Sequence, residues 1–143
     1  MDYKVTADEW YHRALKEKDE FVKFILLFIS LEVIWKLKSN DDLRKIKNDN
    51  SIKVKFYDKI DQKFLAELKY ELYVNPLKNM KYDRGDKRSV KLNSINDFDG
   101  IIEFIIISRN NLFHGDKGLD EKRDLFIVKS GIKILQPLVE VIF

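Results

Sequence analysis

Turn-forming residues are scarce in this chain, and their scarcity constrains the fold more than any other feature of the sequence. The 143 residues include only five glycines and two prolines, while 45% of them are hydrophobic. A fold of many short strands needs frequent turns, so this composition favours helices. A chain of this length can also bury a core of its own, and we expect a single domain over residues 1–143.

The first part of the chain carries apolar residues at helical spacing. Thr6 and Glu9 form a capping-box pattern, and aromatic and aliphatic residues then recur every three or four positions to about Lys38. We expect one long helix here, or two helices in line. Its aromatic stripe packs in the core or, as the alternative, lines a ligand groove. Ser39-Asn40 interrupts the pattern and can cap a following element at Asp41.

The middle of the chain predicts shorter elements. The polar stretch 41–50 holds two aliphatic residues three positions apart, which fits one short exposed helix. Residues 52–56 alternate like a strand, but a lone strand leaves its backbone groups unpaired. A helix from about Lys55 that ends before Asn75-Pro76 is therefore favoured.

Lys78 to Lys91 is a basic segment, with six basic residues against two acidic ones and Gly85 in its middle. The pattern indicates an exposed loop or a fraying element. Such a segment can be a solvated connection, or its cations can contact phosphate groups.

The most apolar stretch begins after Asn93–Asp97, which offers several N-cap residues. Residues 98–113 are so rich in isoleucine that a buried strand is an alternative. A helix is favoured by length and by Gly115, which stands where a C-cap glycine belongs. Because it is apolar all round, we expect this helix at the centre of the core.

Helical spacing resumes after Asp120, a candidate N-cap, and continues to the end of the chain. Pro137 interrupts this last helix and predicts a kink near Lys133 or Ile134.

Charge and cysteine content exclude several classes of protein. The net charge of +3 is too small for a histone-like binder of polyanions, and the absence of cysteine excludes disulfides and thiol chemistry. The sequence shows neither a signal-peptide pattern nor a confident membrane span. We expect a soluble, cytoplasmic protein that does not contact a membrane.

The candidate catalytic residues lie together in one segment, Arg109-Asn110-Asn111-Leu112-Phe113-His114-Gly115. The chain has only two histidines, and we expect His12 to be a surface residue. If the protein is an enzyme, we therefore expect His114 to be its proton-transfer group. Residues five apart on a straight helix point about 140° away from each other. Arg109 and His114 therefore converge only if the helix ends or loosens between them, for which Asn110-Asn111 and Gly115 are suited.

A guanidinium beside an imidazole is suited to phosphate chemistry. Arginine binds two phosphate oxygens and neutralises charge that develops at phosphorus, while histidine exchanges protons near neutral pH. With RNA the ribose 2′-hydroxyl is an internal nucleophile, so no metal ion is needed. No carboxylate cage for magnesium can be placed near His114, and we expect no cofactor. Glu32, among apolar residues, either reaches solvent or orients an arginine in the cleft.

The order of elements resembles the HEPN family. An aromatic-rich first helix precedes an apolar helix that ends in the motif. In the motif a polar residue, Asn110, follows Arg109 directly, and four positions separate Arg109 from His114. A glycine-containing turn and a final helix follow. The resemblance rests on residues 98–143. It implies an all-α, HEPN-like bundle of about four to six helices with an up-and-down core.

The resemblance also implies a function. Many HEPN proteins are homodimeric, metal-independent ribonucleases that act as toxins, in defence or in RNA processing. Carried onto this chain, Arg109 and His114 are the catalytic pair and Asn110 is the supporting polar residue, with Asn111, Ser108 and Lys117 as weaker candidates for RNA contact. A dimer would bring two copies of His114 to one composite site, leaving 2′,3′-cyclic phosphate and 5′-hydroxyl ends.

Two other functions stay open. The chain could be a HEPN module that binds nucleotide or RNA, or a dimeric partner, without catalysis. It could also be a structural helical domain in which the motif is fortuitous. As a toxin it would have an antitoxin partner, for example of the nucleotidyltransferase type.

Overall fold

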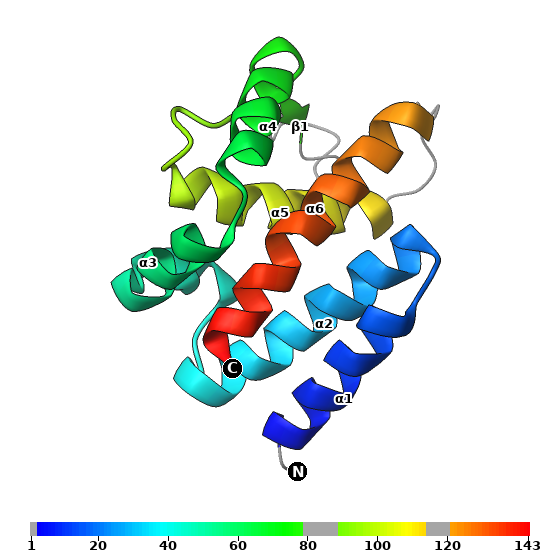
Figure 1. Ribbon diagram of the computed structural model, residues 1–143, viewed down its shortest axis with the longest axis vertical. Helices are drawn as coiled ribbons and strands as arrows, with labels where there is room; N and C mark the ends of the chain where they lie inside the picture. Colours follow the sequence, from blue (N-terminus) through cyan, green and yellow to red (C-terminus); the bar gives the residue numbers. More distant parts are fainter. Residues whose placement is uncertain (1–2, 79–88, 114–120) are drawn as a thin grey trace.

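The computed structural model describes residues 3–78, 89–113 and 121–143. Within these ranges it holds six α-helices, one 3₁₀-helix and a pair of two-residue strands, so the predicted all-α bundle is confirmed. In Figure 1, α2 (Glu20–Ser39) and α6 (Glu121–Ile142) lie side by side and run in the same direction, and α5 (Phe98–Phe113) crosses α6.

The first two helices form an antiparallel hairpin, so neither one long helix nor two helices in line is correct (Figure 1). After α1 (Tyr3–Lys16), the Glu17 carboxylate accepts hydrogen bonds from the N–H groups of the next two residues. Asp19 then caps α2 by accepting from the N–H of Val22 at 3.1 Å. These local bonds replace helical ones and let the chain reverse. α1 begins before Thr6, so the capping box predicted there is wrong.

The end of α2 depends on Asn40. This residue has a left-handed φ of 58°, and its N–H donates to the carbonyl of Lys36. Asparagine adopts this conformation more readily than most residues, which is why it commonly ends helices. The predicted break at Ser39-Asn40 is confirmed, with Asn40 acting as the C-cap of α2.

The 3₁₀-helix η1 (Leu43–Asn48) follows at once. Its N-cap is Asp42, not Asp41, and the Asp42 carboxylate accepts from the N–H of Arg44 at 2.8 Å. Ile46 of η1 is fully buried. The short helix expected over 41–50 is therefore present, with Ile46 buried and Lys45 and Asn48 exposed.

Residues 52–56 are helical, and the strand alternative is wrong. Two helices stand where one was expected from Lys55: α3 (Asn50–Lys59) and α4 (Gln62–Val74). Asp49 caps the first and Asp61 the second, each through its side chain. Aspartates at both caps favour separate helices over one continuous helix.

The ends of the predicted basic loop pair with each other. β1 (Leu77–Lys78) and β2 (Ser89–Val90) are antiparallel, with Leu77 opposite Val90 and both side chains buried. The centre of the basic segment, residues 79–88, lies outside the described residues.

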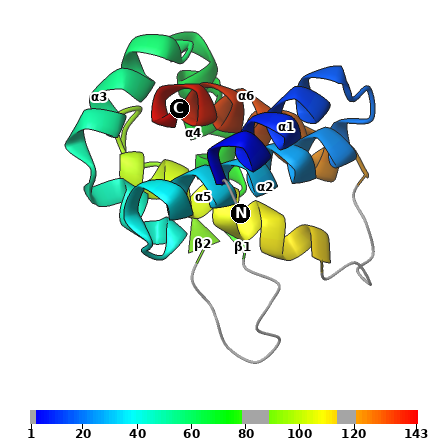
Figure 2. The same ribbon diagram turned by 90° about the horizontal axis from the view of Figure 1, so that it is seen from below.

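α5 is the central element, as its composition predicts. Asp97 caps it by accepting from the N–H of Gly100 at 3.0 Å. From residue 101 to 107 every side chain except Glu103 is buried. Figure 2 shows the reason, since α5 lies between α6 and the β1–β2 pair. The predicted C-cap Gly115 lies outside the described residues.

α6 is continuous through Pro137, and the kink predicted before that residue stays a prediction. Its predicted cap, Asp120, lies outside the described residues. Among the helices that the structure describes, none has the length and apolarity needed to cross a membrane.

Candidate functional site

The last turns of α5 carry the part of the motif that the structure describes. Arg109 and Asn110 are both half-buried, and both line a pocket of about 910 Å³. The guanidinium carbon of Arg109 lies 5.3 Å from the centre of the Phe28 ring on α2, within range of a cation–π interaction. The pocket is large enough for a nucleotide-sized ligand.

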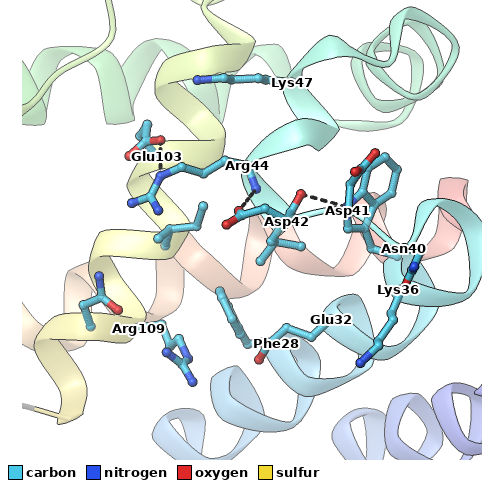
Figure 3. Close-up of a pocket in the computed structure, with 14 residues that line it drawn as sticks. Phe28, Glu32, Lys36, Asn40, Asp41, Asp42, Arg44, Lys47, Glu103 and Arg109 are labelled. Carbon is cyan, nitrogen blue, oxygen red and sulfur yellow. Dashed lines mark hydrogen bonds and ion pairs between the residues drawn. The ribbon is translucent and has the colours of Figure 1, made fainter.

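Three elements form the pocket: α2, η1 with the residues just before it, and α5 (Figure 3). From α5 it receives Glu103, Ile106, Arg109 and Asn110, which lie within about a third of the helix circumference. The otherwise apolar helix thus presents Glu103, Arg109 and Asn110 to the pocket, together with the buried Ile106.

Opposite charges are balanced around the pocket. Four basic side chains line it, Lys36, Arg44, Lys47 and Arg109, together with four acidic ones, Glu32, Asp41, Asp42 and Glu103. A ligand with both a phosphate and polar hydrogen-bonding groups fits such a lining better than a bare anion does.

Arg44 and Glu103 form the ion pair that joins η1 to α5. Arg44 Nε donates to Glu103 Oε1 at 2.8 Å, and both side chains are partly exposed. The backbone before η1 is fixed from α2, because Trp35 Nε1 donates to the Asp42 carbonyl at 3.0 Å. These two contacts fix the position of Asp42 and η1, which form the side of the pocket opposite Arg109 (Figure 3).

Two of the weaker candidates lie elsewhere. Ser108 is buried, and its hydroxyl donates to the Phe104 carbonyl at 2.6 Å. Asn111 Nδ2 donates to the Lys78 carbonyl at 2.8 Å and so ties α5 to β1. Neither residue lines the pocket, and both hydrogen bonds stabilise α5 and its surroundings. The expected RNA contacts of Ser108 and Asn111 stay predictions.

His114 and Lys117 lie outside the described residues. α5 is helical through Asn110 and Asn111 to Phe113. The loosening of the helix that was expected at the two asparagines is therefore absent. His114 follows directly on the last residue of α5.

Glu32 is exposed on α2 and lines the same pocket as Arg109. His12 is also exposed, as expected, with its side chain 3.4 Å from Asp8 on α1. Arg44, Lys47, Lys36 and Glu103 were missed as site residues. The only local signal for Arg44 and Lys47 is their spacing of three within a short helix.

No family model, curated protein or solved structure matches the chain. The function is therefore argued from the chemistry of the pocket and the motif.

Proposed function

We propose that this protein is a HEPN-like, metal-independent endoribonuclease that cleaves single-stranded RNA. One observation carries the proposal: Arg109 and Asn110 line an open, nucleotide-sized pocket at the end of α5, and His114 follows that helix directly. A buried or outward-facing Arg109 would have favoured a fortuitous motif.

The reaction needs a proton acceptor, a cation that binds the phosphate and a proton donor from the protein. His114 accepts the proton of the ribose 2′-hydroxyl, whose oxygen then attacks the neighbouring phosphorus. Arg109 binds the phosphate oxygens and stabilises the extra negative charge of the transition state. The bond from phosphorus to the 5′ oxygen breaks as that oxygen takes up a proton, which leaves a 2′,3′-cyclic phosphate and a 5′-hydroxyl.

A second proton-transfer group must protonate the leaving oxygen. In a twofold dimer packed about the motif, the partner's His114 would serve, giving one composite site per dimer. Such an enzyme fits a cytoplasmic toxin or defence ribonuclease, restrained in the toxin case by an antitoxin such as a nucleotidyltransferase-type protein. Elution of the purified protein as a monomer at catalytic concentrations would contradict the composite site.

Cleavage of a labelled single-stranded RNA in excess EDTA tests the activity. His114→Ala should lower the rate by about 10²–10⁴-fold, and Arg109→Ala by about 10²–10³-fold. His12→Ala is the matched control, because it removes the other, exposed histidine and should leave the rate unchanged. Full activity of His114→Ala, or strict dependence on a divalent ion, would overturn the mechanism.

The balanced charges of the pocket favour one alternative, a module that binds a nucleotide or RNA without cleaving it. This alternative predicts binding that Arg109→Ala weakens, together with intact RNA after prolonged incubation. Detection of 2′,3′-cyclic phosphate ends formed by the wild type, and lost in His114→Ala, would exclude it.

A further inference from the structure

The six residues of the 3₁₀-helix η1 form three edges along the helix axis, with two residues on each edge. In a 3₁₀-helix, side chains three residues apart eclipse each other. Leu43 and Ile46 therefore share the inner edge, where Ile46 is fully buried. Arg44 and Lys47 share a second edge and both line the pocket with Arg109. The third edge, with Lys45 and Asn48, lines a different pocket of about 410 Å³.

Arg44 is held so that part of its guanidinium stays available. Its Nε donates to Glu103, which leaves the two terminal nitrogens as a fork of donors. Lys47 forms no ion pair with any residue in the described part of the chain. Figure 3 shows both side chains extending from η1 toward α5, the helix that carries Arg109.

Two of the four carboxylates that line the pocket are already engaged. Glu103 accepts from Arg44 Nε, and the Asp42 carboxylate accepts from the backbone N–H of Arg44. Glu103 and Arg109 both line the pocket and are six residues apart on α5, about 9 Å along the helix axis and about 120° around it. A short piece of extended RNA strand spans such a distance.

We propose that Arg44 and Lys47 form a second phosphate-binding site, which holds a phosphate of the RNA strand next to the one bound at Arg109. This inference rests on the proposed function for its ligand, single-stranded RNA, but it concerns binding and not the bond that breaks. Arg44 binds the phosphate with its terminal nitrogens while Glu103 positions it, and Lys47 adds a point charge.

Binding is measured with a fluorescent 2′-O-methyl RNA oligonucleotide, which lacks the nucleophilic hydroxyl and is not cleaved. Arg44→Ala/Lys47→Ala should raise the Kd about tenfold at low salt. The slope of log K against log salt should become less steep by about 0.7, since the variant loses one single-strand phosphate contact. The matched control is Lys45→Ala/Lys63→Ala, which removes two exposed cations outside the pocket and should change the Kd less than about twofold.

Arg44→Lys keeps the charge and loses the fork, so it should bind with an intermediate Kd. Equal affinity of the two double variants, or no binding by the wild type, would overturn the site. Cleavage of unmodified RNA separates this result from the proposed function. If the wild type binds RNA, the double variant binds it more weakly and neither cleaves it, the result supports the phosphate site and contradicts the nuclease. If the double variant cleaves RNA with an unchanged KM, the result contradicts the phosphate site alone.

Discussion

The guanidinium carbon of Arg109 on α5 lies 5.3 Å from the centre of the Phe28 ring on α2. Phe28 is almost fully buried, and its ring stacks on that of Phe24 with centroids 6.3 Å apart. Both rings belong to the core, so the cation rests on a part of the molecule that does not move easily. Phe28 therefore helps to position the Arg109 guanidinium in the pocket that both residues line.

Phe28→Leu should lower RNA cleavage by about two- to fivefold, because a cation–π contact of this kind contributes about 0.5–1 kcal/mol. Phe24→Leu is the matched control, since it removes a similar number of buried atoms one turn away and leaves the Arg109 contact in place. Steady-state cleavage rates and urea midpoints of both variants provide the comparison. If the two variants lose activity equally, Phe28 acts only through stability.

Gly131→Ala should destabilise the fold. A Cβ at Gly131 on α6 would lie 2.7 Å from Phe24 Cδ2 and closer still to Cε2. Alanine gains about 0.5–1 kcal/mol in helix propensity, but forcing the fully buried ring to shift costs about 1–3 kcal/mol. We expect a net loss of about 1 kcal/mol in urea unfolding. Phe24→Leu in the same chain should recover part of it, and additive losses would show that the two sites do not clash.

α5 could be predicted because its signal is local and redundant. Residues 98–113 are too long for a buried strand, and an apolar run of that length has to lie at the centre of the core. The hairpin of α1 and α2 could not, because the chain reverses at Glu17 and Asp19 without glycine or proline. The turn depends on side-chain hydrogen bonds of a kind that also occurs at helix starts. The residues of the turn therefore do not show whether the second helix reverses direction or continues in line with the first.

Part of the candidate site could also be predicted from the sequence, and part could not. Arg109 and Asn110 belong to a contiguous motif, and the structure brings both to one pocket. Arg44 and Glu103 are 59 residues apart in the sequence, and their ion pair depends on how η1 packs against α5. No spacing in the sequence encodes such a pair, since each residue alone reads as an ordinary surface charge.

Asp97→Ala should destabilise the protein by about 1–2 kcal/mol, because its carboxylate caps α5 and also accepts from the N–H of Asn93 at 3.1 Å. Asn96→Ala is the matched control at the preceding, exposed residue and should cost much less. Urea unfolding of both variants measures the difference. Equal losses would show that the turn as a whole, and not the Asp97 cap, sets the stability of this end of α5.

A network at the end of α6 joins three helices. Tyr11 Oη on α1 donates to Glu140 Oε1 at 2.5 Å, and Lys59 Nζ on α3 donates to Glu140 Oε2 at 3.0 Å. Burial tends to raise the pKa of Glu140, but hydrogen bonds from Tyr11, Lys59 and Gln136 and the charge of Lys59 outweigh it, so the pKa is lowered. Burial and the same carboxylate raise the pKa of Tyr11.

Glu140→Gln should therefore destabilise the protein near neutral pH, by about 0.5 kcal/mol for a partly exposed network. Because the folded-state pKa of Glu140 lies below its ordinary value of 4.5, the carboxylate stabilises the fold above that value and loses this effect as the pH falls through the lowered pKa. Urea midpoints should differ between wild type and variant near pH 7 and converge as the pH falls below the lowered pKa of Glu140. Asp58→Asn, at an exposed carboxylate next to Lys59 in the sequence, is the control and should change the urea midpoint near pH 7 only slightly. A gap between wild type and Glu140→Gln that persists at the acidic pH would mean that the glutamate stabilises through packing and not through its charge.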